Sequence, residues 1–259
     1  MENPSRLQSA AAWAIRARVL RGKLSQLAQR AMVGVGHDIE EDGVKLRCHL
    51  GDNTTERDVF IRGFNAPRVG LMRVVGELKS GDTFVDVGAN CGIFTAFAAK
   101  KVGPAGRVVA IEPMPEMLER LRHNVAINGF QHVTIFATAV GEDRGTATLH
   151  LHPRNRGKSS IVPTFSGSAI EVPVQSLADI AKTAGLECID ILKVDIEGFE
   201  DRALIPFIST AAQNLWPKRI FMEIVHSRIW QRDCVAFLLD AGYDRLWQTD
   251  TDIALELQR

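Results

Sequence analysis

The chain has 259 residues, 46% hydrophobic and 24% charged, which is the composition of a folded domain with a full core. Its 31 acidic and 31 basic side chains balance, so no overall field favours nucleic acid or another polyanion. Four scattered cysteines without a C-x-x-C pair argue against a zinc site or a disulfide framework and favour a reducing cytoplasm: Cys48, Cys91, Cys188 and Cys234.

Residues 1–36 are predicted to form a basic amphipathic helical extension. Apolar side chains recur at helical spacing and predict one stripe: Trp13, Ala17, Leu20, Leu24, Leu27 and Ala31. No run approaches the ~20 apolar residues of a membrane span. The helix is expected to pack on the domain as a lid or to be partly disordered. Binding to an anionic membrane surface or a partner, and a transit-peptide role, are the alternatives.

Residues 37–80 are predicted to form a cap of strands and a helix that precedes the core. An acidic, turn-prone stretch at 37–43 indicates a boundary. Residues 44–50 alternate apolar and polar side chains, as in a half-exposed strand, and residues 58–63 are expected to pair with them. Residues 67–78 are predicted to be helical.

Residues 81–259 are predicted to form an α/β domain organised around residues 83–95. An apolar strand at 83–87 runs into a glycine loop and then into a helix at 93–102. Gly88 and Gly92 permit a tight turn that a ligand can approach closely, and the helix directs free N–H groups toward that ligand. This arrangement predicts a ligand-holding turn.

The spacing of this loop indicates which ligand it holds. A dinucleotide loop of the G-x-G-x-x-G type has glycine where Asn90 and Ile93 stand here, so a pyrophosphate is disfavoured. A second apolar strand at 107–111 ends in Glu112, 20 residues after Gly92, where an acidic side chain reaches a ribose hydroxyl in nucleotide-binding units. A nucleoside without a pyrophosphate fits best.

The remaining pattern predicts a largely parallel sheet. Further core strands are expected at 133–137, 189–194 and 219–224, with helices at 115–128 and 233–241 and an insertion of strand character at 146–152 and 170–174. Two terminal strands at 243–247 and 253–257 are expected to form a hairpin.

Four motifs in this order resemble the FkbM family of class I S-adenosylmethionine (SAM) methyltransferases: DVGANCG at 86–92, EP at 112–113, AVG at 139–141 and KVDIEGFE at 193–200. The resemblance covers residues 81–223. It implies a Rossmann-like sheet whose last strand is antiparallel, and SAM as cofactor. The implied cofactor residues are Asp86, Gly88, Asn90, Gly92, Glu112, Pro113, Ala139 and Val140.

A second chemical centre follows the strand at 189–194. Methyl transfer to an alcohol needs an aligned oxygen that loses its proton, and Asp195 is the leading candidate for the base. Glu197 and Lys193 are expected to orient the substrate or one another, although Lys193 pairing with a carboxylate is an alternative. His226 is an alternative base. Asp195, Glu197 and Glu223 offer oxygen ligands for magnesium, but their spacing is not diagnostic and no metal is expected.

These observations predict a SAM-dependent methyltransferase that acts on a hydroxyl of a sugar, glycolipid or small natural product. N-methylation, methylation of a macromolecule, and a non-catalytic SAM-binding scaffold are the alternatives. The expected partner is a small hydroxylated acceptor rather than nucleic acid, and the expected location is the cytoplasm, with peripheral membrane contact through the N-terminal helix as an option.

Overall fold

The computed structural model describes residues 5–258 except 18, 20–22, 25–27, 29–34, 64–68, 153–154 and 164–167; for residues 69–72 and 156 it describes the backbone only. The helices are α1 (Arg6–Arg16), α3 (Thr54–Arg62), α4 (Val69–Glu77), α5 (Ile93–Val102), α6 (Pro115–Ala126), α7 (Leu177–Thr183), α8 (Glu200–Thr210) and α9 (Cys234–Asp240). Three short 3-10 helices are η1 (Arg156–Lys158), η2 (Gln213–Leu215) and η3 (Ser227–Ile229).

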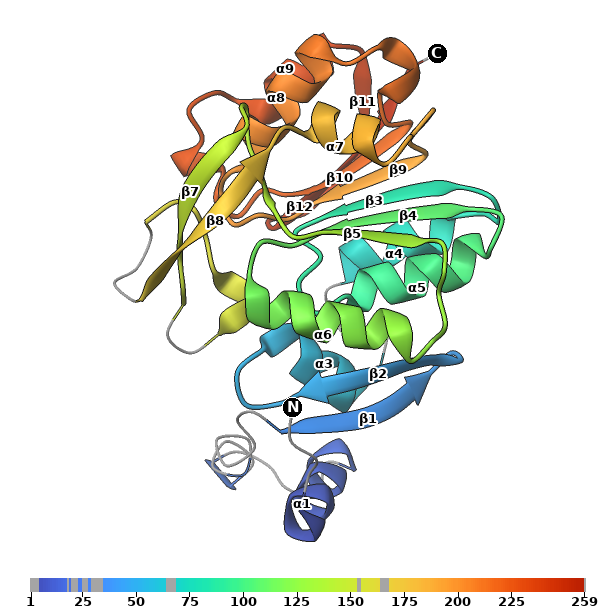
Figure 1. Cartoon of the computed structure of the whole chain (residues 1–259), viewed down its shortest axis with the longest axis vertical. Helices are drawn as coiled ribbons and strands as arrows, with labels where there is room; N and C mark the ends of the chain where they lie inside the picture. Colours follow the sequence, from blue (N-terminus) through green and yellow to red (C-terminus); the bar gives the residue numbers. More distant parts are fainter. Residues whose placement is uncertain are drawn as a thin grey trace.

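The strands are β1 (Gly36–Glu41), β2 (Val44–His49), β3 (Thr83–Val87), β4 (Arg107–Ile111), β5 (Val133–Phe136), β6 (Ala139–Val140), β7 (Gly145–His150), β8 (Ala169–Gln175), β9 (Ile191–Val194), β10 (Arg219–Glu223), β11 (Tyr243–Gln248) and β12 (Asp252–Leu257). Seven of them form a central sheet in the order β5-β4-β3-β9-β10-β12-β11 (Figure 1). β3, β4, β5, β9 and β10 run parallel, whereas β12 runs antiparallel to β10 and β11. The predicted antiparallel last strand is therefore confirmed.

β3 lies where the strand order reverses, because β4 pairs with one of its edges and β9 with the other. Open α/β sheets bind their ligands outside the carboxyl ends of the strands at such a point. The glycine loop that follows β3 is thereby placed at the predicted site.

Helices cover both faces of the sheet, with α4, α5 and α6 on one face and α7, α8 and α9 on the other (Figure 1). Successive residues of β3 enter the two cores in turn. Phe84 packs in the cluster that contains Phe97 of α5, and Val85 packs in the cluster that contains Leu204 of α8. The apolar run of β3 therefore reflects burial on both faces.

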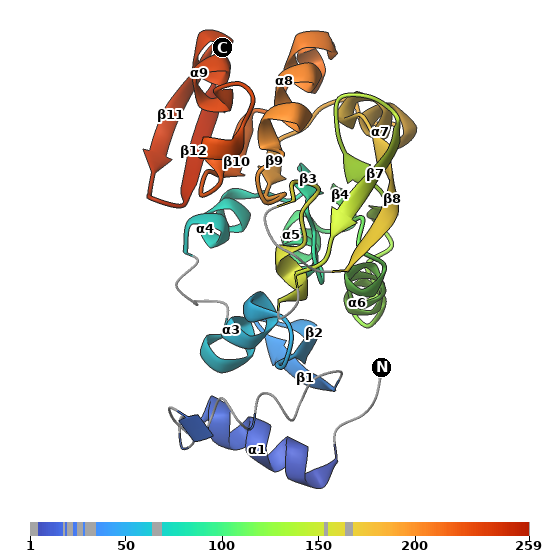
Figure 2. The ribbon, with the colours of Figure 1, turned by 90° about the vertical axis from the view of Figure 1, so that its left-hand side faces the viewer.

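The segment before the core forms a hairpin of β1 and β2 followed by α3, and it lies between α1 and the core (Figure 2). The predicted pairing of residues 44–50 with 58–63 is wrong, because residues 58–62 belong to α3 and the partner of β2 is β1. Asp42 and Gly43 both have positive φ, 48° and 68°, as a two-residue hairpin turn requires. Asn53 caps α3 by accepting hydrogen bonds from the backbone N–H groups of Thr55 and Glu56.

The N-terminal helix α1 begins with a capping box between Ser5 and Gln8. Its buried residues are Ala12 and Ile15, whereas Trp13 is 68% exposed. The predicted apolar stripe is therefore wrong for the described part of α1, since the side chains that pack on the cap lie on another face. Of the other stripe residues, Ala17 and Leu24 are exposed, and Leu20, Leu27 and Ala31 lie outside the described residues.

The packing of α1 is against the cap, where Arg16 forms an ion pair with Glu41 and stacks over the ring of Phe60. Among the described residues, no helix combines the length and apolar character required to cross a membrane. Binding of α1 to a membrane surface stays a prediction.

The predicted insertion between the third and fourth core strands is a three-stranded sheet in the order β6-β8-β7. β6 continues directly from β5, so Ala139 and Val140 lie beside the ends of the core strands. His150, at the end of β7, forms a β-bridge with Ser160. The described part of residues 155–161 therefore lies near the carboxyl ends of the central strands.

Candidate active site

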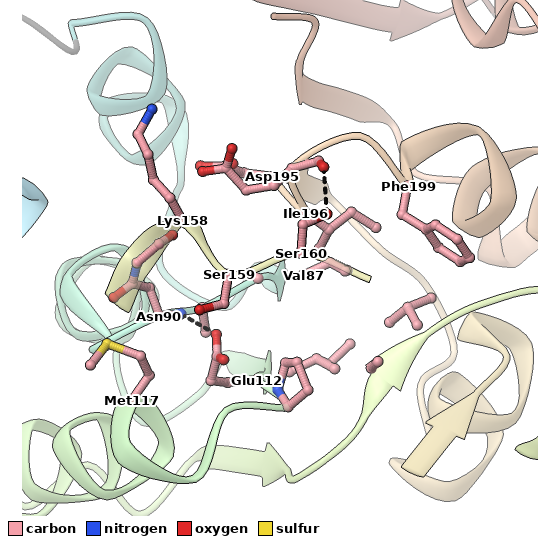
Figure 3. Close-up of a pocket in the computed structure, with 18 of the residues that line it drawn as sticks. Val87, Asn90, Glu112, Met117, Lys158, Ser159, Ser160, Asp195, Ile196 and Phe199 are labelled. Carbon is pink, nitrogen blue, oxygen red and sulfur yellow. Dashed lines mark hydrogen bonds between the residues drawn. The ribbon is translucent and has the colours of Figure 1, made fainter. Parts of the chain in front are cut away.

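A cleft of about 1000 Å³, including the part open to solvent, lies at the carboxyl ends of β3, β4 and β9 (Figure 3). Six predicted cofactor residues line it: Gly88, Asn90, Glu112, Pro113, Ala139 and Val140. Asp86 is wholly buried and supports the loop from behind, and Gly92 is the N-cap of α5.

The glycine loop needs Gly88 for a reason that the sequence does not reveal. Gly88 has φ +75°, and a Cβ atom there would lie 1.9 Å from the backbone oxygen of Asp195. The loop after β3 and the loop after β9 therefore touch directly, backbone against backbone. This contact places the predicted cofactor loop beside the predicted catalytic residue.

A buried ion pair supports this loop. Lys193 Nζ lies 3.1 Å from Asp86 Oδ1 and donates a 2.6 Å hydrogen bond to the carbonyl oxygen of Gly88. Asp86 Oδ2 accepts a hydrogen bond from the hydroxyl of Thr95. Burial lowers the pKa of Lys193, but the carboxylates of Asp86 and Asp195 raise it by more, so the net pKa is above its usual value. The geometry favours the pairing alternative for Lys193, although its side chain also lines the cleft.

Glu112 offers carboxylate oxygens to the cleft from the end of β4. Its Oε2 accepts from the backbone N–H of Asn90 at 2.8 Å, and its Oε1 accepts from that of Met114 at 2.9 Å. Burial raises the pKa of Glu112 to about 7, despite these two donors. A carboxylate can accept about four hydrogen bonds, so further acceptor capacity remains for a pair of ribose hydroxyls. Glu112 thus fits the nucleoside part of SAM.

Asn90 links three parts of the chain around the cofactor loop. Its Oδ1 accepts hydrogen bonds from Asn53 of the cap and from the backbone N–H of Cys91, both at 2.7 Å. Its Nδ2 lies 3.4 Å from the carbonyl oxygen of Gly157, in the segment that covers the cleft. The sequence did not predict a role for Asn53 at this site. The signal for Asn53 was its capping position before α3, which the incorrect strand prediction concealed.

Asp195 and Glu197 follow β9 and line the same cleft, and Figure 3 shows Asp195 across it from Glu112. The backbone N–H of Asp195 donates to the carbonyl oxygen of Val87 at 3.1 Å. His226 is not among the described residues that line the cleft, but its Nε2 lies 2.9 Å from Glu197 Oε2. The structure therefore brings together Asp195, Glu197 and Lys193 at the cleft and places His226 behind Glu197.

Glu200 organises the turn that contains these residues. Its Oε1 accepts hydrogen bonds from the backbone N–H groups of Ile196 and Gly198, and its Oε2 accepts one from the indole of Trp230. Glu200 is buried, and burial raises its pKa above the usual value. Its position in the first turn of α8 agrees with the preference of carboxylates for helix N-termini, but its main contacts are with the preceding loop.

The strand order with antiparallel β12, together with an acidic side chain after the second core strand, is that of the Rossmann-like class I methyltransferase fold. Residues 86–245 match the family described as the methyltransferase FkbM domain, and the chain belongs to this family. The motifs predicted this family.

Two curated relatives are similar over the same region. Methyltransferase sdnD of Sordaria araneosa is 29% identical over 157 residues, and 31-O-demethyl-FK506 methyltransferase FkbM of Streptomyces tacrolimicus is 30% identical over 158 residues. Each match covers 49% of this chain and 60% of the relative. The solved structure of methyltransferase FkbM from Methylobacillus flagellatus matches with a TM-score of 0.48 and 17% identity, over 97% of this chain and 59% of that chain.

Proposed function

We propose that this chain transfers the methyl group of SAM to a hydroxyl oxygen of a small acceptor, of the sugar, glycolipid or natural-product class. The observation that carries the proposal is the position of Asp195, a cleft-lining carboxylate whose backbone touches the cofactor loop at Gly88. A carboxylate beside the methyl donor can accept the proton that an alcohol loses on methylation. The name of the Streptomyces relative, which refers to a 31-O-demethyl compound, supports an oxygen acceptor.

Different cleft residues are positioned to bind different parts of SAM. Glu112 accepts hydrogen bonds from the ribose hydroxyls, and the loop from Gly88 to Gly92 faces the methionine end, close to the helix N-terminus of α5. Ala139 and Val140 supply apolar surface for the adenine. When bound, SAM supplies an electrophilic methyl group on a positively charged sulfur.

On the acceptor side, Asp195 would accept a hydrogen bond from the acceptor hydroxyl and take up its proton. A fixed position of the acceptor hydroxyl in the cleft would supply a further part of the rate. Glu197, held by its contact with His226, borders the same part of the cleft and orients the acceptor. His226 is the alternative base, acting through the same pair.

Calorimetric titration of the purified chain with SAM, S-adenosylhomocysteine and NAD tests the cofactor. We expect saturable binding of the first two, none of NAD, and at least tenfold weaker SAM binding in Glu112→Ala. A Gly88→Val variant is unsuitable as the binding control, since its added carbons would strike the backbone of Asp195. Folded protein that does not bind SAM would overturn the proposal.

Transfer of labelled methyl from SAM to panels of sugars, phenolic and polyketide alcohols, amines and proteins then tests the acceptor class. Products methylated at oxygen on small molecules support the proposal. Exclusive labelling of amines or of macromolecules would replace it with one of the alternatives from the sequence. Binding of SAM without transfer to any panel member would favour the non-catalytic scaffold.

A further inference from the structure

Three metal-ligating side chains converge beside the acceptor end of the cleft. One carboxylate oxygen each from Glu197 and Glu223 and one ring nitrogen of His226 all lie within 4.8 Å of one another. They come from the loop after β9, the end of β10 and the residue that precedes η3. We propose that these three residues bind one divalent cation that receives the acceptor hydroxyl. This inference rests on the proposed function and extends it to a metal-assisted acceptor site.

Two atoms of the cluster are spaced like neighbouring ligands of one metal, and the third lies within 4.8 Å of both. Glu197 Oε2 and His226 Nε2 are 2.9 Å apart. Two ligand atoms at ~2.1 Å from one metal and at right angles to each other are separated by about 3 Å, so these two atoms already have the separation of neighbouring ligands. Two carboxylates this close also repel each other unless positive charge lies between them. An imidazole with two carboxylates suits Mn²⁺, Fe²⁺ or Zn²⁺ better than Mg²⁺ or Ca²⁺, which prefer oxygen ligands throughout.

The backbone holds Glu197 in the conformation that the cluster requires. Glu197 has φ +53°, in the left-handed region that residues other than glycine seldom adopt. Its carbonyl oxygen accepts a 2.8 Å hydrogen bond from the hydroxyl of Ser160, and the N–H groups on either side of it both donate to Glu200. Such conformations persist where the surroundings fix them, and they gather at functional sites.

One ligand of the cluster is buried in the protein, and another faces the cleft. Glu223 is 9% exposed, whereas Glu197 lines the cleft together with Asp195. A cation held here would be reached from the cleft beside Glu197, where an acceptor with two adjacent oxygens, such as a sugar diol, could chelate it. A bound cation lowers the pKa of a coordinated hydroxyl, so Asp195 would remove its proton more readily. The inferred acceptor class is therefore a vicinal diol or a comparable chelating alcohol.

Binding of Mn²⁺ to the chelator-treated full chain tests the site directly, with free Mn²⁺ followed by electron paramagnetic resonance. We expect one Mn²⁺ per chain, displaced by Zn²⁺, and at least tenfold weaker binding in Glu223→Gln and in His226→Gln. Glu171→Gln is the matched control, since it makes the same chemical change on an exposed strand residue and should bind Mn²⁺ as the wild type does. Retained SAM binding shows that each variant is folded.

Absence of saturable Mn²⁺ or Zn²⁺ binding by the SAM-competent wild type would overturn the cation site, as would unchanged affinity in both cluster variants. Methyl transfer that survives chelation and still depends on Asp195 would reject the cation while keeping O-methylation, and the Glu197–His226 pair would then act as a proton relay. Cluster-dependent Mn²⁺ binding in a chain that methylates only amines would keep the cation site and reject O-methylation.

Discussion

Lys193 and Asp86 stand directly opposite each other on the neighbouring strands β9 and β3, and their side chains form a buried ion pair beneath the cofactor loop. The ammonium group also holds the carbonyl oxygen of Gly88. This pair therefore joins the strand that leads to the cofactor residues with the strand that leads to Asp195.

Replacing Lys193 with Met should lower the free energy of unfolding by about 3–5 kcal/mol, because it leaves the Asp86 carboxylate buried without its cation. Urea unfolding measures this loss. Lys101→Met, at an exposed position of α5, should change stability by less than about 0.5 kcal/mol. Adding Asp86→Asn to Lys193→Met should restore part of the stability; a double variant no more stable than the single one would contradict the pairing.

Gly88→Ala should abolish SAM binding or folding, since its Cβ meets the Asp195 carbonyl oxygen, which cannot move away easily. Gly129→Ala is a close control. Gly129 also has positive φ, 68°, but nothing lies within 4 Å of the added carbon, so only the conformational cost of about 1–2 kcal/mol applies. Thermal unfolding and SAM calorimetry compare the two, and equal effects would show that the contact with Asp195 is unimportant.

The affinity for SAM should fall as the pH is lowered below about 7. Burial places the pKa of Glu112 at about 7 in the free protein, and ribose hydroxyls donate to its ionised form. Protonation then competes with binding, so the affinity approaches a tenfold decrease per pH unit below the pKa. Calorimetry between pH 5.5 and 8 measures the slope; Glu112→Gln should remove it, and an equal slope in that variant would assign it to another group.

Glu112 also makes the unfolding free energy depend on pH, but in the opposite direction: lower pH weakens SAM binding and raises stability. A carboxyl pKa raised from 4.5 to about 7 on folding contributes stability below pH 4.5, and this contribution is lost as the pH rises through about 7. Between pH 5 and 8 the unfolding free energy of the wild type should fall by about 2 kcal/mol relative to Glu112→Gln. Urea unfolding of both proteins at the two pH values measures the difference, and parallel changes would argue against the raised pKa.

Asp195→Asn should reduce kcat by about 10²–10⁴ with little change in SAM affinity, as expected when a general base is lost. Single-turnover methyl transfer with the best acceptor measures the rate. Asp143→Asn, on an exposed loop residue, should retain wild-type kcat. A loss of only a fewfold would move the base assignment to His226.

Arg120→Met should destabilise the attachment of the cap. The buried guanidinium binds Asp52, Glu56 and Glu116, and Glu56 is fully buried. Losing it leaves the buried Glu56 carboxylate with His49 as its partner but without its guanidinium, at a cost of up to about 3–5 kcal/mol. Limited proteolysis should then cleave the cap before the core. Arg122→Met replaces an exposed arginine of the same helix and should leave the cleavage pattern unchanged. If both variants gave the same cleavage pattern, the contacts of Arg120 would not be what attaches the cap.

Local sequence was sufficient for elements whose signals lie in consecutive residues. The run before Gly88 indicated β3, and the spacing of Gly92 and Glu112 indicated a nucleoside site, because burial on both faces and loop conformation impose such patterns directly. The cap shows where this fails. The Asp42-Gly43 turn is a strong hairpin signal, but the acidic residues around it suggested a boundary, so the strand partner of β2 was misassigned.

The sequence by itself determined the order of the family motifs, the cofactor loop and the placement of Asp195 after a core strand. Only the tertiary structure decided that Lys193 opposes Asp86, that Asn53 reaches Asn90, and that Glu197, Glu223 and His226 meet. These contacts depend on strand register and on the packing of loops across the sheet edge. Local patterns record which side of an element is buried, but they do not record which distant residue will face it.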